Sequence, residues 1–398
     1  MKIYTAKVYH TNTKTSSITN KPHHSAKTQT QTFAKLHFIN LILKQIAKRG
    51  CQIVNFLLQY VKFESSSRQT FHVKPLARTA TKTIPTPLEA PLTKRTHQIK
   101  VISYEGSSYR TDFWEGQGRE FENRTERKAI RRLLPKTGDV IIEIGAGFGR
   151  LADLYQDYDQ IILLDYSLSL LMEAQKTFGA DPKYKFIAAN VYNLPLANNL
   201  VDTAVMIRVA HHLESPDDAL DEIHRILRSN GVFIMEFANK RNAKAIARYL
   251  LQKQKWSPFT PEPYEFVPLN FDFHPKWMRQ ALARHNFRTE KELSISNFRL
   301  SILKKHISPE TLARIDNAIA GPGALLKLSP SILTKNIAVK PKAEATGMFI
   351  CPKCKGTDLE FQEDAVICSH CGESWPIISG IVDFRYPRPE TIEAHEKH

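Results

Sequence analysis

Long apolar runs and cysteine are both scarce in this 398-residue chain, and each scarcity excludes a class of protein. The uncharged apolar stretch at residues 50–61 is too short to cross a bilayer, which takes ~20 residues, so we expect no transmembrane segment. No small-residue cleavage site follows it, which argues against a secretory signal. Five cysteines are too few for a disulfide scaffold of this size. With 42% hydrophobic and 24% charged residues, we expect a globular, cytoplasmic protein of two or three domains.

Acidic residues are nearly missing from the first quarter of the chain. Residues 1–100 hold 17 Lys and Arg but only Glu64 and Glu89, whereas residues 101–398 hold 39 Lys and Arg and 38 acids. The net charge of +16 therefore belongs to a Ser-, Thr- and Lys-rich extension that we expect to be largely disordered. Four interpretations of it stay open: a helix on a membrane surface, an arm that contacts RNA or DNA, an organelle transit peptide, and an unstructured tail ahead of a true start near Tyr104.

Short apolar runs alternate with helical patterns after residue 139. The runs are residues 140–144, 160–165, 184–188, 202–207 and 231–237, and the helical patterns between them cover 150–156, 168–178 and 216–227. Strands that alternate with helices predict an α/β fold, in which a parallel sheet carries helices on both faces. We place this domain at residues 101–340, with a core at 139–237 and an insertion at 238–300. We then expect a linker at 341–348, a compact cysteine-bearing module at 349–385 and a charged tail at 386–398.

A strand, a glycine-rich loop and a helix begin the core. Gly145, Gly147 and Gly149 allow a tight turn and the close approach of a ligand to the backbone. A dinucleotide fingerprint, G-x-G-x-x-G, would place its last glycine where Arg150 stands. Glu143 precedes the loop by two residues, where a carboxylate repels a pyrophosphate and attracts an ammonium or sulfonium group. The loop therefore favours a ligand with a cationic amino-acid end.

Polar side chains close the next two strands. Asp165 lies twenty residues after Gly145, where a carboxylate accepts hydrogen bonds from both hydroxyls of a ribose. Nicotinamide dinucleotides and S-adenosylmethionine share this contact, so Asp165 indicates a nucleoside without choosing between them. Asn190 ends the third strand, and its amide is suited to the edge of an adenine. Because ligands of parallel sheets bind at the carboxyl ends of the strands, we expect these side chains to line one site.

The motif series over residues 139–237 resembles that of class I S-adenosylmethionine-dependent methyltransferases, in particular the type 11-like members. The matching segments are EIGAGFG, LLDYS, AANVYNLPLANNLVDTAVMIRVAHHL and LDEIHRILRSNGVFIMEF. The resemblance implies a Rossmann-like sheet of seven strands, whose antiparallel last strand we expect at residues 331–340, and S-adenosylmethionine as the cofactor. The cofactor-binding residues that we carry over to this chain are Glu143, Gly145, Ala146, Gly147, Gly149, Asp165, Tyr166, Asn190, Val191 and Arg208.

Methyl transfer is an in-line displacement at a sulfonium carbon, for which close and aligned binding supplies most of the rate. A general base is needed only where the acceptor is protonated, and it then contributes ~10²–10⁴-fold. Arg208, His211 and His212 follow the fourth strand and are the catalytic candidates. A histidine of this loop faces the methyl group in many members of the family, so His211 ranks first and His212 second. Either could instead cap or pack against the following helix, and Glu236 is a weaker candidate.

The acceptor site is expected in the insertion at residues 238–300. Prolines and aromatic residues between positions 256 and 277 suggest a lid over a cleft, although aromatic residues also serve core packing. Tyr109, Trp114 and Arg119 would close the cleft from the other side, as the segment before the first strand often does in this family.

Four of the five cysteines form two C-x₂-C pairs near the end of the chain. Cys351 and Cys354 are followed, after 13 residues, by Cys368 and Cys371, a gap slightly under the usual ~15–20. Each pair can present two thiolates to one tetrahedral ion, and four thiolates leave no open catalytic position. We therefore predict a structural zinc site, with paired disulfides and a redox role as the alternatives.

The cysteine-bearing module resembles the small zinc-ribbon proteins that activate tRNA, rRNA and release-factor methyltransferases. The segments that match are ICPKCKG and VICSHCGESWPIISGIVDF. In that family the small subunit covers an apolar strand of the methyltransferase, so the resemblance implies the same role in cis. A zinc ribbon also begins some rRNA guanine methyltransferases, which keeps an RNA substrate open.

Our leading interpretation is an S-adenosylmethionine-dependent methyltransferase with a structural zinc ribbon. Because residues 101–398 are nearly neutral, a broad phosphate-binding face is disfavoured, and a small or lipid-like acceptor is preferred. The alternatives are an rRNA or tRNA methyltransferase and a non-catalytic cofactor-binding scaffold that recruits a partner through the ribbon. An NAD-dependent oxidoreductase is disfavoured by Glu143 and Arg150. RNA or membrane contact through the basic extension stays open.

Overall fold

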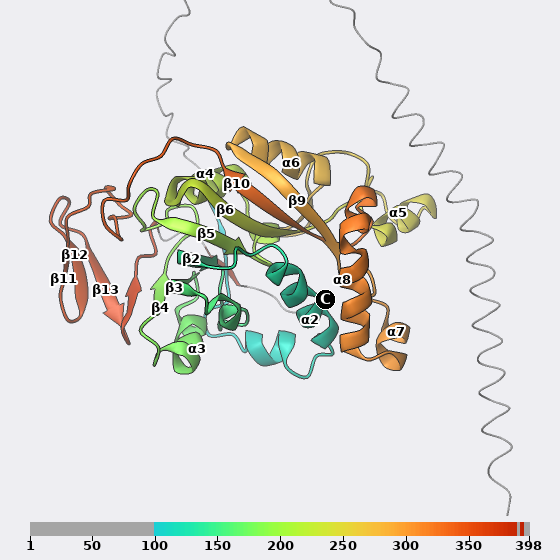
Figure 1. Ribbon diagram of the computed structural model, residues 1–398, viewed down its shortest axis with the longest axis horizontal. Coiled ribbons are helices and arrows are strands. Elements are labelled where there is room, and N and C mark those ends of the chain that lie inside the picture. The colour runs from blue at the N-terminus through green and yellow to red at the C-terminus, as the bar shows by residue number, and fades with distance from the viewer. Residues whose placement is uncertain (1–98, 388–390, 394–398) are drawn as a thin grey trace, which may run out of the picture. The chain divides into compact units, whose positions relative to one another are not determined.

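The computed structural model describes residues 99–387 and 391–393 (Figure 1). The interpretations of the basic extension and of most of the charged tail therefore lie outside the described residues.

Seven strands form the central sheet of the domain. They are β2 (Gly138–Ile144), β3 (Tyr158–Asp165), β4 (Tyr184–Ala188), β5 (Val201–Met206), β6 (Leu227–Ala238), β9 (Phe287–Ile295) and β10 (Ser331–Ala338). Their order is β4-β3-β2-β5-β6-β10-β9, and only β10 runs antiparallel to its neighbours. This confirms the predicted α/β fold, including an antiparallel strand in the last part of the domain.

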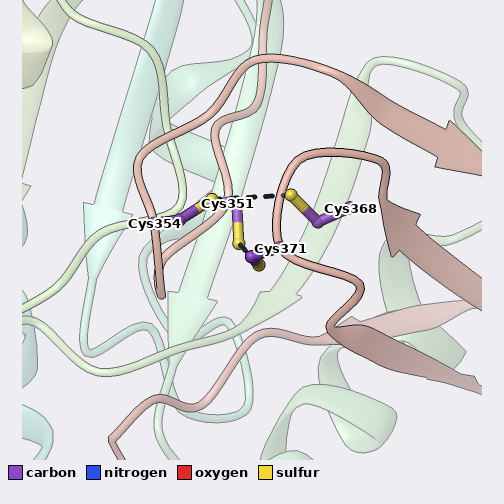
Figure 2. A group of neighbouring side chains, drawn as sticks. All are labelled: Cys351, Cys354, Cys368 and Cys371. Atoms are coloured by element: carbon purple, nitrogen blue, oxygen red, sulfur yellow. Dashed lines mark hydrogen bonds between the residues drawn. The ribbon is translucent and has the colours of Figure 1, made fainter.

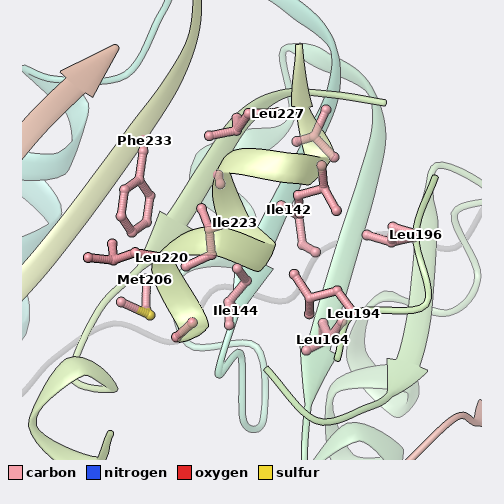
Figure 3. Packing of buried hydrophobic residues seen from close by; sticks show 14 of the residues in the cluster. Ile142, Ile144, Leu164, Leu194, Leu196, Met206, Leu220, Ile223, Leu227 and Phe233 are labelled. Atoms are coloured by element: carbon pink, nitrogen blue, oxygen red, sulfur yellow. The ribbon is translucent and has the colours of Figure 1, made fainter. Parts of the chain in front are cut away.

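Helices cover both faces of this sheet. They are α2 (Glu120–Arg131), α3 (Leu168–Phe178), α4 (Pro216–Ile226), α5 (Ala243–Leu250), α6 (Pro275–Arg284), α7 (Ser301–His306) and α8 (Pro309–Leu326). In a strand, successive side chains point to opposite faces. Ile142 of β2 accordingly packs in one apolar cluster with Ile223 of α4 and Met278 of α6, as Figure 3 shows for part of it. Ile141 belongs to a second cluster with Ile130 of α2 and Leu171 of α3.

The helix expected at residues 150–156 is reduced to one 3₁₀ turn, Ala152–Tyr155. The cause is the short connection, because β3 begins at Tyr158 and leaves no room for a second turn. The next connection is longer, and Ser167 starts α3 there by accepting a hydrogen bond from Leu170 N at its side chain (3.3 Å).

The cysteine-bearing module extends the same sheet. Its strands are β11 (Leu359–Phe361), β12 (Ala365–Cys368), β13 (Ser374–Ile378) and β14 (Ile381–Asp383), which pair antiparallel in that order. β14 then pairs in parallel with β4, with Val382 opposite Ile187 and Asp383 opposite Ala188. The result is one sheet of eleven strands, in which the module covers the edge that β4 would otherwise expose.

Two smaller pairings complete the fold. β1 (Val101–Ser103) pairs in parallel with β15 (Thr391–Glu393), and β7 (Tyr264–Val267) forms a hairpin with β8 (Asn270–Asp272) inside the insertion. Within residues 99–387 and 391–393, no helix has the length and apolar character needed to span a membrane.

Candidate cofactor pocket and cysteine cluster

A pocket lies at the carboxyl ends of the parallel strands, where ligands of such sheets bind. Eight of the predicted cofactor-binding residues line it: Glu143, Gly145, Ala146, Gly147, Asp165, Tyr166, Val191 and Arg208. The aromatic residues Tyr104, Tyr109, Trp114, Phe148 and Tyr192 contribute to its walls. Gly149 and Asn190 are not among the lining residues.

The glycine loop is shaped by its hydrogen bonds and by steric limits. Gly145 N and Ala146 N both donate to Leu164 O, at 2.8 and 3.0 Å, which holds the loop against the end of β3. Gly145 has φ +75°, and a Cβ added there would lie 2.1 Å from Val209 Cγ2. A Cβ at Gly149 would lie 2.9 Å from the Phe178 ring, so this glycine serves the packing of α3 against the loop. Asn190 is buried, and its Oδ1 accepts a hydrogen bond from Tyr192 N within its own loop (3.1 Å).

Asp165 is anchored by backbone groups on two sides. Its Oδ2 accepts a hydrogen bond from Gly147 N (2.7 Å), and its Oδ1 accepts one from Ser167 N (2.8 Å). Burial raises the pKa of Asp165, although these N–H groups oppose the rise. Each carboxylate oxygen has a second acceptor site. Asp165 is therefore held in one orientation with acceptor capacity left for a ligand.

Glu143 is the least satisfied polar group of the pocket. Its side chain is buried, and Oε2 has no hydrogen-bond partner within the described part of the chain. Burial raises the pKa of Glu143 to about 8, although Arg150 and the nearby hydroxyl of Tyr155 oppose the rise; neither that hydroxyl nor Oε2 has a partner in hydrogen-bond geometry among the described residues. A buried carboxylate without a partner is costly, and a cation beside it removes the cost. The pocket thus offers a place for a positively charged group next to the glycine loop.

Glu126 joins two arginines of the pocket wall, Arg150 and Arg208, and the sequence did not predict this role. Its carboxylate is buried and accepts hydrogen bonds from Arg150 Nη2 (2.9 Å) and from Arg208 Nε and Nη2 (2.9 and 2.5 Å). The two guanidinium groups lie 3.8 and 4.9 Å from the ring centre of Trp114. Burial would raise the pKa of Glu126, but Arg208 and Arg150 outweigh it and the pKa is lowered. The available signal was its position one helical turn from Glu122 and Ile130, on the buried face of α2.

Of the candidate catalytic residues that follow β5, Arg208 and His212 line the pocket and His211 does not. His212 lines the pocket, whereas His211 is not among the lining residues, although the two ring centres are only 3.9 Å apart. Burial lowers the pKa of both histidines, to about 4 for His212. Arg208 has the left-handed value φ +60°, and its N–H donates to Glu236 Oε2 (3.1 Å).

The hydrogen bonds of His212 assign the state of its ring. Nδ1 lies 3.1 Å from Leu269 O, which can only accept, so Nδ1 carries the proton. Nε2 is then the acceptor for the hydroxyl of Tyr104 at 3.3 Å. Because burial lowers its pKa to about 4, His212 is neutral near neutral pH, and it joins the insertion to the aromatic wall of the pocket.

The segment before the sheet contributes to the pocket wall, whereas the insertion does not. Tyr109 and Trp114 line the pocket, as expected, while the guanidinium of Arg119 lies over the Phe113 ring at 3.5 Å instead. No residue of 238–300 lines this pocket. The insertion holds its own loop through Lys240, whose Nζ donates to Thr260 Oγ1 (2.8 Å) and Glu262 O (2.6 Å).

The four cysteines of the C-terminal module converge on one point (Figure 2). All four Sγ atoms lie within 4.8 Å of one another, and the pairs Cys351–Cys371 and Cys354–Cys368 are 3.7 and 3.6 Å apart. These separations are too long for S–S bonds. Four sulfurs around a tetrahedral zinc ion at ~2.3 Å are ~3.8 Å apart, so the cluster has the size of such a site.

The module also holds the loop that follows β4. Asn193 Nδ2 donates to Pro352 O (2.7 Å), in the turn between the first two cysteines, and to Tyr386 O (3.1 Å). Phe384 N donates to Ala188 O at 2.8 Å. Because Ala189, Val191 and Tyr192 of the same loop line the pocket, the cysteine turn and the pocket share one piece of chain.

Known proteins resemble this chain over its central part. Residues 142–235 match the family described as a methyltransferase domain. A demethylmenaquinone methyltransferase of Chlamydia felis is 32% identical over 26% of this chain and 46% of its own length. A malonyl-acyl-carrier protein O-methyltransferase of Hamiltonella defensa is 25% identical over 35% of this chain and 53% of its own length.

Two further similarities cover more of the chain. An uncharacterized chloroplastic methyltransferase of Arabidopsis thaliana is 27% identical over 45% of this chain and 45% of its own length. This chain therefore spans about half the length of the curated relatives that it matches. One chain in a solved Haloferax volcanii complex, between the Trm112 methyltransferase activator and a methyltransferase, has a TM-score of 0.41 at 17% identity, over 57% of this chain and 97% of that chain.

The Glu126→Gln variant should lose on the order of 3–5 kcal/mol of the free energy of unfolding, because it leaves two largely buried arginines without their shared carboxylate. Urea unfolding measures the loss. Glu120→Gln, an exposed glutamate at the start of the same helix, is the matched control and should change stability by less than ~0.5 kcal/mol. Equal effects of the two substitutions would contradict a structural role for the Glu126 ion pairs.

Proposed function

We propose that this protein is an S-adenosylmethionine-dependent methyltransferase that transfers the methyl group to a small or lipid-like acceptor. We also propose that the cysteine-bearing module of the same chain holds a structural zinc ion. The observation that carries the proposal is the buried Oε2 of Glu143, which has no hydrogen-bond partner among the described residues and lies at the glycine loop. Such a carboxylate suits the cationic amino-acid end of this cofactor and disfavours a pyrophosphate.

The residues of the pocket fit the remaining parts of the cofactor. When bound, S-adenosylmethionine supplies a methyl group on a sulfonium, which makes that carbon electrophilic. Asp165, fixed by Gly147 N and Ser167 N, would accept the ribose hydroxyls. Gly147 leaves room for close approach at the backbone, because a Cβ added there would meet only Leu170 Cδ1, at 3.8 Å. Tyr166 and Val191 would flank the nucleoside.

Two observations favour a small or lipid-like acceptor over RNA. Residues 101–398 carry nearly equal numbers of basic and acidic side chains, whereas phosphate contacts require clustered Lys and Arg. Two relatives are named for demethylmenaquinone and for malonyl-acyl-carrier protein, neither of which is a nucleic acid. The aromatic wall of Tyr104, Tyr109 and Trp114 offers an apolar surface for such an acceptor.

We assign His212 to positioning rather than to proton removal. A pKa of about 4 makes its ring a weak base near neutral pH. Its hydrogen bonds to Leu269 O and to the Tyr104 hydroxyl fix the side chain of Tyr104 at the pocket. Alignment of the acceptor, which supplies much of the rate in methyl transfer, would depend on that wall. Burial lowers the pKa of His211 as well, and this residue does not line the pocket, so it suits proton removal no better than His212. Arg208 lines the pocket and stays as a candidate.

Calorimetric titration with S-adenosylmethionine, and separately with NAD, tests the cofactor assignment. Asp165→Ala should weaken binding of S-adenosylmethionine at least ~10-fold through loss of the ribose contacts. Asp159→Ala removes an exposed aspartate from the same strand and should leave the affinity unchanged. Binding of NAD in preference, or equal affinity in both variants, would contradict the proposal; binding of neither cofactor would favour the non-catalytic scaffold.

Affinity for S-adenosylmethionine should rise with pH between 7 and about 8. Burial raises the pKa of Glu143 to about 8, so the free carboxyl is largely protonated at neutral pH, and a cation beside it favours the ionised form. Binding should therefore release a proton, which titrations in buffers of different ionisation enthalpy detect. The Glu143→Gln variant should bind more weakly and lose the pH dependence. A wild-type affinity that is flat over this range would remove Glu143 from the ammonium site.

Metal analysis of the purified protein should find one zinc ion per chain, and the double variant Cys351→Ser, Cys368→Ser should lose it. Because Asn193 ties the pocket loop to the turn at Pro352, we expect the zinc-free protein to bind S-adenosylmethionine on the order of tenfold more weakly. Cys51→Ser, which removes the fifth cysteine of the sequence, is the control. Retained zinc in the double variant would refute the metal site, and unchanged cofactor affinity would refute its link to the pocket.

A further inference from the structure

Exposed aliphatic side chains gather on three helices outside the pocket. Of the thirteen large hydrophobic residues exposed in the described part of the chain, eight lie on or directly beside α5, α7 and α8. They come in pairs, namely Leu250 and Leu251 at the end of α5, Leu300 and Ile302 at the start of α7, Leu325 and Leu326 at the end of α8, and two isoleucines in the middle of α8. We call these eight residues the helical apolar surface.

The three helices are neighbours in the fold. Ala243 N donates to Leu328 O (2.8 Å), so α5 begins beside the end of α8. Leu303 of α7 packs against the small apolar cluster that contains Leu312 and Ala313 of α8. Figure 1 draws α5, α7 and α8 together on the right of the sheet. On α8 the exposed Ile315, Ile319 and Leu326 recur at helical spacing, so its outward face is apolar as well as its inward one.

Basic side chains surround this surface. Residues 243–261 carry four Lys and Arg and no acid, and Lys244, Arg248, Lys253 and Lys255 are all exposed. Residues 300–309 again hold no acid, and Lys305 is exposed there, whereas Lys304 pairs with Glu122 of α2. The two acids of α8 are engaged, because Glu310 pairs with Lys128 and Arg314 while Asp316 is buried. This clustering stands out in a domain whose total charge is near zero.

The helical apolar surface starts at the edge of the sheet that holds the pocket. α5 follows the carboxyl end of β6 at Ala238. α8 ends shortly before β10, whose first residue, Ser331, pairs with Ala238. A bilayer in contact with these helices would therefore lie near the edge where the cofactor pocket opens.

We propose that the helical apolar surface binds the surface of a bilayer that contains anionic lipid. Leucines inserted among the acyl chains and lysines at the headgroups are the two contributions that hold an amphipathic basic helix at a membrane. This inference deepens the proposed function and rests on it in one respect: it specifies that the acceptor is drawn from a membrane.

The same features disfavour the other occupants of the surface. An RNA backbone would pair with the lysines but would leave the exposed leucines in water. A symmetric dimer through this surface would set the basic residues of two copies against each other without acids to compensate. The test described below distinguishes RNA binding and self-association from membrane binding.

The test is hydrogen–deuterium exchange of the full chain, with and without vesicles of phosphatidylcholine that contain about one third phosphatidylserine. Peptides from α5 and from the end of α8 should gain protection with these vesicles and much less with phosphatidylcholine alone. Because residues 1–100 are themselves basic, resolution by peptide separates their contribution from that of the helices. Protection confined to residues 1–100, or absent altogether, would overturn the proposal.

Variants give a second, quantitative arm by vesicle flotation. Replacing Leu250, Leu251, Leu325 and Leu326 by Ser should weaken partition into these vesicles on the order of tenfold. Replacing the exposed Val339 and Phe361 by Ser is the matched control and should have no effect. Stronger protection of α5 by an RNA oligonucleotide than by vesicles, or self-association that the leucine variant abolishes, would replace the membrane by that occupant. Calorimetric binding of S-adenosylmethionine by the leucine variant should equal that of the wild type, so a failure of membrane binding is distinguished from a failure of the cofactor assignment.

Discussion

One buried carboxylate, that of Glu126, determines how the pocket is assembled. It lies on α2, ahead of the sheet in the sequence, yet its two partners come from the end of the glycine loop and from the end of β5. A buried charge is tolerated only when it is paired, so α2 can dock only if Arg150 and Arg208 are brought to it. Trp114 then covers both guanidinium groups. The wall that faces a bound ligand is thus a consequence of burying a single acid.

The opposite side of the pocket depends on a pairing of strands. β4 would be an edge strand of a seven-stranded sheet, and β14 removes that edge by pairing with it. The cysteine turn also binds the loop after β4 through Asn193. Its Nδ2 donates a hydrogen bond to Pro352 O, and its Oδ1 accepts one from Lys355 Nζ. Two segments remote in sequence therefore define the pocket, one by ion pairing before the sheet and one by strand addition after it.

Local patterns predicted the strands of the sheet well, because each strand is a short apolar run that ends at polar or glycine residues. Glu143, Gly145 and Asp165 could be placed at one edge from the apolar runs that precede them. The 3₁₀ turn at Ala152–Tyr155 was not predicted, since its length is set by the start of β3 and not by its own helical pattern. The pairing of Glu126 with Arg208 spans 82 positions, and no local signal reports a contact of that range. The same holds for the hydrogen bond between Tyr104 and His212, and for the turn of Asn190 toward its own loop.

The two carboxylates at the ends of β2 and β3 differ in a way that separates their roles. Asp165 has both oxygens engaged by backbone N–H groups, so its orientation is fixed and it has acceptor sites to offer to hydroxyl groups. Glu143 is the more deeply buried of the two, one of its oxygens has no partner among the described residues, and burial raises its pKa to about 8. A hydroxyl group would satisfy that oxygen without compensating the charge, whereas a cation does both. Adjacent strands thus present an acceptor for hydroxyls and an acceptor for positive charge, which is the pairing of groups that a nucleoside joined to an amino acid requires.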